Sequence, residues 1–209
     1  MSPRMSCAAF LAVVVAASAA VFVSGKDDVV TFKIDKKLHP LFADSTSVLK
    51  QGSAPQLQNY VFKNCGDPKT DLAKVGSIVL GPDPVVFPGP LTVSFQVNIT
   101  KTLDAPLKGQ VVLEKKLGSS WIKIPCIGVI GSCEYSDVCD LLKNAQCPPP
   151  FVAKNIPCKC PFSQGNYALP SSKFVVEVPV FPAGDYHAHG NLTSNGQQVA
   201  CVDLFVTFA

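Results

Sequence analysis

LTVSFQVNIT, at residues 91–100, alternates apolar and polar side chains without a break. Alternation with a period of two is typical of a β-strand that has one buried face and one solvated face. The chain also contains 18 prolines and 14 glycines, which interrupt it too often for long helices. The sequence therefore predicts an all-β protein, with this strand as its clearest element.

Six other runs with β character lie before and after this strand, at residues 77–80, 107–115, 121–125, 173–178, 186–193 and 198–208. The last two flank Ser194-Asn195-Gly196, and an Asn-Gly pair between two such runs is a strong signal for a β-hairpin. Residues 136–143 are expected to form a helix, because the segment opens with cap-type residues and ends with a lysine. This many strands with one short helix indicates a single β-sandwich or cup.

The cysteines point to an oxidising compartment. Cys7 lies in an N-terminal stretch with one arginine and a long apolar run, which is typical of a secretory signal peptide. We expect residues 1–25 to be removed, with cleavage near residues 20–25. Eight of the nine cysteines then remain, and an even number in a secreted chain predicts four disulfides rather than thiolate chemistry. Spacing alone does not choose among the possible pairings.

The rest of the chain divides into a leader and one domain. Residues 26–58 are polar and mixed, without cysteine or sustained periodicity, and are expected to be a flexible or removable leader. Residues 60–209 are long enough for one domain. Only 16% of the residues are charged and 47% are hydrophobic, so much uncharged surface must be buried or presented to something apolar. The net charge of +3 and the lack of a basic block indicate no nucleic-acid partner.

Two glycosylation sequons occur, at Asn98-Ile99-Thr100 and at Asn191-Leu192-Thr193. Asn98 falls on the polar side of the strand at residues 91–100, where a glycan would stand in solvent. Asn191 shares its strand face with a row of polar residues. Both asparagines are therefore predicted to be glycosylation sites.

No catalytic centre is evident in the sequence. It has no Gly-x-Ser-x-Gly elbow, no pair of carboxylates stands out, His39 lies in the leader, and the cysteines are better explained as bridges than as nucleophiles. We therefore expect a protein that is not an enzyme and that has no catalytic residue and no cofactor.

One polar pattern raises the alternative of a metal site. Asp185, His187 and His189 alternate on one predicted strand, so they would share a face, and their ligand types suit zinc. A solvated polar strand face explains the pattern more simply, because side chains at i and i+2 diverge and no fourth ligand is evident. We therefore expect no metal.

LEKKLGSSWIKIPC, at residues 113–126, closely resembles the ganglioside activator proteins that assist lysosomal β-hexosaminidase A, which have a lipid-recognition domain of the ML type. Further matching motifs follow in family order: NC at 64–65, PDPVV at 82–86, IGSC at 130–133, CDLL at 139–142, PCKCPF at 157–162, GNYALP at 165–170 and FVV at 174–176. The resemblance extends from about Tyr60 to Ala209 and includes eight cysteines in register with the tryptophan-containing motif.

The resemblance implies a hollow β-cup with an apolar cavity that holds acyl chains. Such a protein lifts a glycosphingolipid from a membrane and presents its sugar to a soluble β-hexosaminidase-type glycosidase. It also implies four disulfides, which join Cys65 with Cys201, Cys126 with Cys133, Cys139 with Cys160, and Cys147 with Cys158. The expected location is the secretory pathway, with the lysosome or the extracellular space as its end.

The resemblance and the strand pattern together select residues for lipid and membrane contact. The apolar strand face supplies Leu91, Val93, Phe95 and Val97, although a filled core would read the same way in sequence. The family's membrane-facing loops match Leu117–Trp121 and a second stretch with Val180 and Phe181, which stand where the vertebrate pattern has an apolar tip that includes a tryptophan. Trp121 is the single tryptophan, and packing in the core is its alternative role.

Two other functions remain open at this stage. A secreted carrier of sterols, fatty acids or other hydrophobic ligands would need the same cup and no enzyme partner. A small disulfide-stapled hydrolase acting on lipids is the third possibility. The identity of the lipid that copurifies with the protein separates the first two, and turnover of a lipid substrate by an empty protein marks the third.

Overall fold

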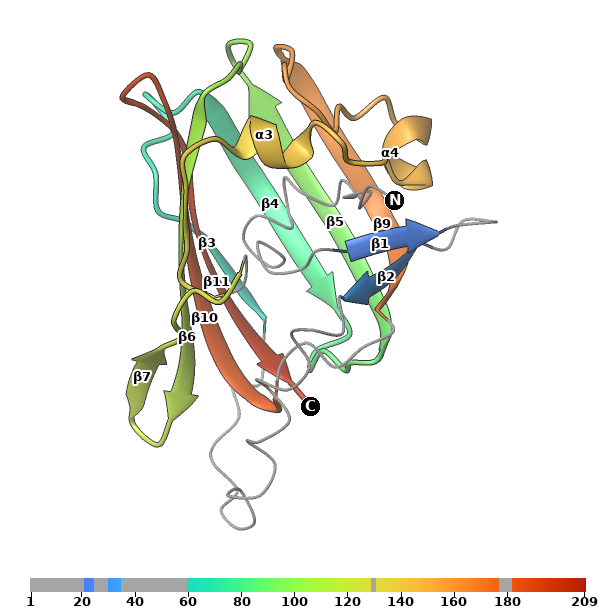
Figure 1. Ribbon diagram of the computed structural model, residues 1–209, viewed down its shortest axis with the longest axis vertical. Helices are drawn as coiled ribbons and strands as arrows, with labels where there is room; N and C mark the ends of the chain where they lie inside the picture. The colour runs from blue at the N-terminus through green and yellow to red at the C-terminus, as the bar shows by residue number, and fades with distance from the viewer. Residues whose placement is uncertain (1–20, 25–29, 35–59, 129–130, 177–181) are drawn as a thin grey trace.

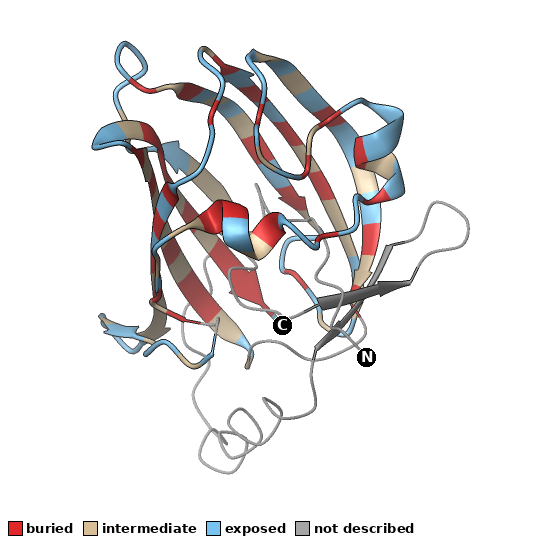
Figure 2. Ribbon diagram, turned by 45° about the horizontal axis from the view of Figure 1, so that its top comes forward, coloured by how far each residue is buried: buried red, intermediate tan, exposed pale blue. Residues whose placement is uncertain are grey.

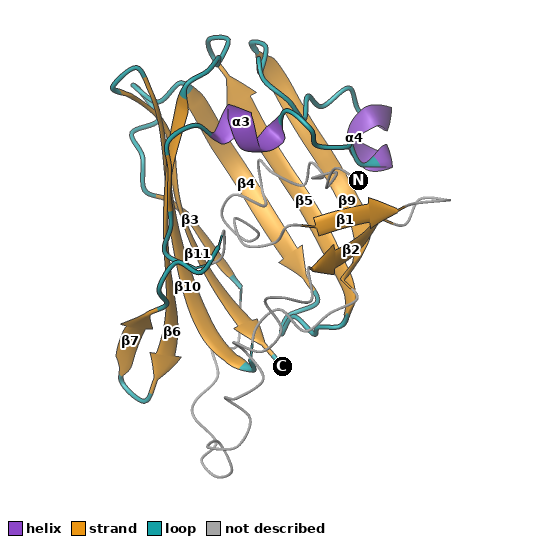
Figure 3. Ribbon diagram, viewed as in Figure 1, coloured by secondary structure: helices purple, strands orange, loops and turns teal. Residues whose placement is uncertain are grey.

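A computed structural model describes residues 60–128, 131–176 and 182–209, together with the backbone of residues 21–24 and 30–34. Two β-sheets form opposite walls of the molecule, and two short helices lie on the connection between them (Figures 1 and 3). The predicted all-β fold is confirmed. No helix in the described part of the chain is long and apolar enough to cross a membrane.

The first sheet has the strand order β1-β2-β9-β5-β4. The predicted alternating strand runs as β5 (Gly89–Ile99) between β4 (Ala73–Gly81) and β9 (Gly165–Val176), and it pairs antiparallel with both. The sequence did not anticipate β1 (Val21–Ser24) and β2 (Val30–Ile34), which pair with each other, and β2 adds to β9 in parallel. Most of the predicted signal peptide and leader lies outside the described residues.

The second sheet has the order β3-β11-β10-β6-β7, and β8 (Glu134–Tyr135) pairs with β6. Its strands are β3 (Val61–Asn64), β6 (Leu107–Leu117), β7 (Ser120–Lys123), β10 (Gly184–Ser194) and β11 (Gln197–Phe208). The predicted hairpin joins β10 to β11. Asn195 and Gly196 have φ values of 50° and 78°, the left-handed conformation that a two-residue hairpin turn requires.

One core lies between the inward faces of the two sheets, and buried positions alternate with exposed ones along most strands (Figure 2). In β5, Val93, Phe95 and Val97 are all less than 9% exposed, whereas Gln96 and Asn98 face solvent. This is the split that the alternation predicts.

The second sheet contributes Leu113, Leu204 and Val206 to the same core.

Two helices occur among the described residues where the sequence predicted one. Within the expected segment, α3 (Val138–Leu142) is shorter than predicted, and its N-cap Asp137 accepts a hydrogen bond from the backbone N–H of Cys139. The second helix, α4 (Pro149–Ala153), follows Pro148. The prolines of this segment argued against a helix. Proline is nevertheless tolerated in the first turn, because an N–H there would have no partner within the helix.

Four disulfides join the eight cysteines of the described residues. They pair Cys65 with Cys201, Cys126 with Cys133, Cys139 with Cys160, and Cys147 with Cys158. These are the four pairs that the family resemblance implies. Three of the bonds lie in the connection that leads from the second sheet through α3 and α4 to the first, and the fourth ties the end of β3 to β11.

Candidate functional site

The strand face selected for lipid contact lies on the inside of the sandwich. Val93, Phe95 and Val97 are buried, and Leu91 is half-buried and packed against the core. The ring of Phe95 lies 5.8 Å from the ring of Phe151, measured between centroids, so α4 covers this part of the inner face. The inner wall is therefore apolar, as a compartment for acyl chains requires.

The apolar inner face of β6 continues into the β6–β7 hairpin, which projects at the lower end of Figure 1. Leu113 is buried on this face, and the strand's alternation places Lys115 and Leu117 on the same side. Ile122 is the cross-strand partner of Lys115 and so shares that side. Leu117 and Ile122 are each 49% exposed. They form an exposed apolar lip at the end of the inner face.

Trp121 lies on the other side of the hairpin, because its cross-strand partner is Lys116. The indole is half-buried, with its ring 5.8 Å from that of His187 and 6.0 Å from that of Phe205, edge to face in both pairs. It therefore packs on the outer face of the second sheet and not between the sheets. Val180 and Phe181, the other predicted membrane contacts, lie outside the described residues.

Lysines surround both sides of this hairpin. Lys116 places its ammonium 6.0 Å from the centre of the Trp121 ring, and Lys115 places its own 5.4 Å from the ring of Tyr186. Burial lowers the pKa of Lys115. Lys123 is exposed at the end of β7. The hairpin thus combines exposed apolar groups with cations. This composition favours binding to an anionic membrane surface.

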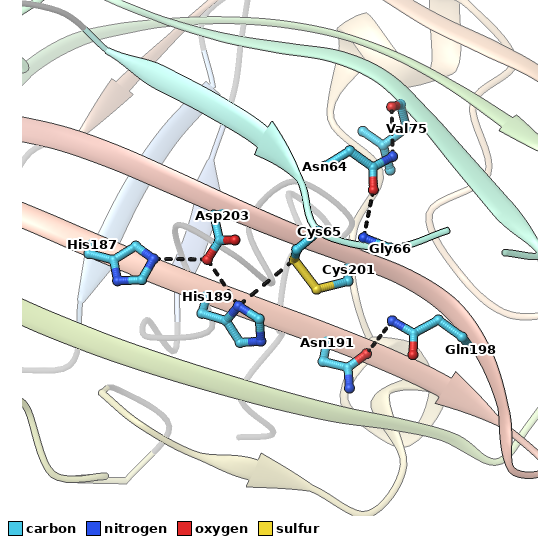
Figure 4. Close-up of a disulfide and its surroundings, with 10 residues drawn as sticks. All are labelled: Asn64, Cys65, Gly66, Val75, His187, His189, Asn191, Gln198, Cys201 and Asp203. Carbon is cyan, nitrogen blue, oxygen red and sulfur yellow. Dashed lines mark hydrogen bonds and ion pairs between the residues drawn. A yellow bond between two sulfur atoms is a disulfide. The ribbon is translucent and has the colours of Figure 1, made fainter. Parts of the chain in front are cut away.

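A cluster of carboxylates and imidazoles occupies the outer face of the second sheet beside Trp121. His187 Nδ1 lies 3.0 Å from Glu114 Oε2, and His187 Nε2 lies 2.8 Å from Asp203 Oδ1. The same oxygen of Asp203 is 2.9 Å from His189 Nδ1 (Figure 4). The His187 ring also stacks on Phe205, with centroids 4.4 Å apart. Neighbouring strands β6, β10 and β11 supply these residues.

The histidines determine the charge state of Asp203. Burial raises the pKa of the Asp203 carboxyl, but the hydrogen bonds from His187 and His189 and the charges of their rings outweigh burial. The net result is a pKa below the ordinary value of 3.8, so this carboxylate is ionised in the folded protein well into the acid range.

The residues considered for a metal site have other partners. Asp185 is buried and accepts a hydrogen bond from the hydroxyl of Thr207, whereas both histidines meet Asp203. Among the described residues, one group of metal-type ligands comes together, Cys65, His189 and Cys201. Its two sulfurs are joined in a disulfide and so offer no thiolate.

The two sequon asparagines differ in their surroundings. Asn98 is exposed on the outer face of β5. Asn191 is half-buried on β10, and its Oδ1 accepts a hydrogen bond of 2.9 Å from Gln198 (Figure 4).

Several residues of the site were missed in the sequence. Ile122 stands in a run already noted as β-like, and its side of the hairpin follows only from the pairing with Lys115. Glu114 and Asp203 lie on different strands from His187, so no local pattern connects them. Phe151 follows three prolines, in a stretch where the sequence predicted no helix.

Two sheets around one apolar core, four disulfides and an apolar lip at one end define a small disulfide-bonded β-sandwich. The family model of the ML domain matches residues 59–208. The chain therefore belongs to the ML domain family.

Curated relatives are similar over most of the chain. The ganglioside GM2 activator of Macaca fascicularis is 38% identical over 163 residues, which cover 74% of this chain and 85% of the relative. The ganglioside GM2 activator of Mus musculus is 36% identical, covering 71% and 81%. A phosphatidylglycerol/phosphatidylinositol transfer protein of Aspergillus fumigatus is 25% identical, covering 79% and 87%.

Proposed function

We propose that this chain is a non-catalytic lipid-binding protein that extracts a ganglioside-type glycosphingolipid from a membrane and presents it to a lysosomal glycosidase of the β-hexosaminidase type. The two relatives above 30% identity bear the name ganglioside GM2 activator, which supports this assignment. The lipid lies between the sheets, and the protein works in the secretory pathway, in the lysosome or outside the cell.

The observation that carries the proposal is the apolar lip of Leu117 and Ile122 at the end of the inner face. When an acyl chain leaves a bilayer, exposure of each methylene to water costs about 0.8 kcal/mol of free energy. A largely apolar path from the membrane surface to the inside of the sandwich lowers that cost. The lip supplies the outer part of such a path, and Leu113, Phe95 and Val97 supply the inner part.

The lip can be tested with the double variant Leu117→Ser/Ile122→Ser. Each side chain is about half exposed, so its loss removes on the order of 1 kcal/mol of membrane contact. Together the two changes should weaken binding to vesicles that contain anionic phospholipid and ganglioside about thirtyfold. Transfer of a fluorescent ganglioside between vesicles should fall with it, while far-UV circular dichroism stays unchanged.

Val79→Ser is a matched control for this experiment. Val79 is 52% exposed, as apolar and as accessible as the lip residues, but it belongs to β4 of the other sheet. It should leave vesicle binding and transfer unchanged. Equal losses in the control and in the lip variant would count against the lip as the site of membrane contact.

A second candidate function is transfer of another lipid without an enzyme partner. The relative named as a phosphatidylglycerol/phosphatidylinositol transfer protein favours it. Native mass spectrometry of the purified chain distinguishes the two, because copurified glycosphingolipid supports the activator and copurified phospholipid or sterol supports the carrier. Faster ganglioside hydrolysis by a β-hexosaminidase in the presence of the chain supports the activator. An empty protein that itself turns over lipid would overturn both.

A further inference from the structure

We infer that Glu114, His187 and Asp203 form a proton-binding site on the outer face of the second sheet, and that the bound proton fixes the β6–β7 hairpin through Trp121. The site binds its proton at low pH and releases it as the pH rises. It is independent of the proposed function, because it requires neither a lipid nor an enzyme.

The two bonds of His187 require a proton. A neutral imidazole has one N–H donor and one acceptor nitrogen, and an ionised carboxylate can only accept. Yet both ring nitrogens of His187 lie at hydrogen-bond distance from carboxylate oxygens, 3.0 Å to Glu114 and 2.8 Å to Asp203. Both bonds form at once only if the cluster holds one proton more than a neutral ring and two carboxylates. The natural place for this proton is the His187 ring, as imidazolium.

His189 does not need a second proton. Its Nδ1 donates to Asp203 in the neutral form if that nitrogen carries the hydrogen. Asp203 Oδ1 then accepts from both histidines, one charged and one neutral. The side chains of His187 and Asp203 are each 20% exposed, so solvent screens the charges only in part.

His187 also links the proton to the hairpin. Among the described strands β7 pairs only with β6, so the hairpin has a free edge. The aromatic side chain of the hairpin on the outer face is Trp121, which packs edge-on against His187 and Phe205, while His187 and Phe205 stack on each other. A change in the position of the His187 ring therefore reaches Trp121 directly.

Loss of the proton breaks this arrangement. A neutral His187 ring can donate to only one carboxylate, which leaves the other facing a nitrogen lone pair at hydrogen-bond distance. The attraction between imidazolium and two carboxylates is lost as well. The ring and one carboxylate must separate, and Trp121 loses its present support. Histidine side chains in general change their charge between pH 5 and 8, and this range is therefore the one to test.

Other charged groups around the cluster do not supply this pH dependence. The outer face carries Asp185 on β10, Lys116 on β6, Lys123 on β7 and Lys63 on β3, in addition to the cluster itself. Lysine and aspartate side chains ordinarily keep their charge from pH 5 to 8. Cys65, whose sulfur is 3.8 Å from His189 Nδ1, is bound in a disulfide and does not titrate.

Trp121 is a built-in reporter, because the chain has one tryptophan. Imidazolium quenches indole fluorescence more strongly than neutral imidazole does. In the lipid-free, full-length protein, the emission of Trp121 should fall as the pH is lowered from 8 to 5. His187→Gln should remove this change. His189→Gln is the matched control: it loses a bond to Asp203 but does not contact Trp121, and it should keep the change.

Glu114→Gln provides an independent variant if His187→Gln folds poorly, which far-UV circular dichroism would reveal. It removes one anion from the imidazolium, so the midpoint of the fluorescence change should move to lower pH. Hydrogen exchange of residues 115–123, corrected for the intrinsic pH dependence, should be slower at pH 5 than at pH 8. Wild-type emission that is flat between pH 5 and 8, or equal protection at both pH values, would overturn the inference.

Discussion

Asp71 is a buried carboxyl without a hydrogen-bond partner. The residue is 3% exposed, and no hydrogen bond of good geometry reaches either carboxylate oxygen. A Cβ on Gly66 would lie 1.9 Å from Asp71 Oδ2, so a side chain at position 66 would displace this carboxyl. Burial raises the pKa of Asp71; the backbone amide of Asp67 opposes that rise and the Asp67 carboxylate adds to it. Folding therefore disfavours the carboxylate form of Asp71 relative to the neutral acid.

Asp71→Asn should stabilise the protein at neutral pH. A raised pKa contributes stability that is fully present below the ordinary value of 3.8 and is lost as the pH rises through the folded value. An amide of the same shape avoids that loss, so the gain should be about 1 kcal/mol at pH 7 and smaller at pH 4. Urea unfolding at the two pH values measures it. A variant that is less stable than the wild type at pH 7 would show that the carboxylate has a favourable partner.

The β10–β11 hairpin depends on its turn residues. Both Asn195 and Gly196 have positive φ, and a Cβ on Gly196 would contact nothing within 4 Å, so the cost of a side chain there is conformational rather than steric crowding. Gly196→Ala should therefore destabilise the protein by about 1 kcal/mol. Thermal unfolding measures this, and Asn195→Gly, which tolerates the same φ, should leave the melting temperature nearly unchanged.

A bulge in this hairpin explains why the proton-binding site could not be predicted from the sequence. The two-residue turn alone pairs Ser194 with Gln197 and would place His187 across from Leu204. The register shifts by one between Leu192 and Thr193, so His187 instead faces Phe205 and shares its side with Asp203. A shift of one residue exchanges the two faces of a strand. No local sequence signal marks it.

Elements with a strong local signal were predictable. The strand β5 follows from its alternation, and α3 follows from Asp137 at its N-cap. The helix α4 was not, because three consecutive prolines conceal a single helical turn. Its Phe151 is held in place by contact with Phe95 on a distant strand, which is a tertiary cause and not a local one.

At the scale of the molecule, the Cys65–Cys201 bond restrains most of the domain. Its cysteines are 136 residues apart, and in the chain-entropy model the loss of such a bond costs about 5 kcal/mol. Replacing both cysteines by alanine should lower the stability by that order. The Cys126–Cys133 bond spans 7 residues, and its removal should cost about 2.5 kcal/mol. Denaturant unfolding of the two double variants tests the ranking, and a reversed order would contradict it.

The overall arrangement was predictable, whereas the state of the interior was not. Alternating strands and eight cysteines indicate a stapled sandwich, but an apolar inner face such as that of Val93 and Phe95 reads alike in a filled and a hollow domain. The family resemblance supplied the expectation of a cavity. The lip depends on the solvent exposure of Leu117 and Ile122 in the fold, which their residue types alone do not indicate.

The disulfides in the connection between the sheets affect what proteolysis does to the protein. The Cys147–Cys158 bond lies within the span of Cys139–Cys160, and both bracket α4 and the exposed residues Lys154 and Asn155. A peptide bond cut at Lys154 would leave two fragments that three disulfides still hold together, because the Cys65–Cys201 bond also joins them. In a compartment rich in endopeptidases, the chain can thus be nicked at this point and remain one covalent molecule.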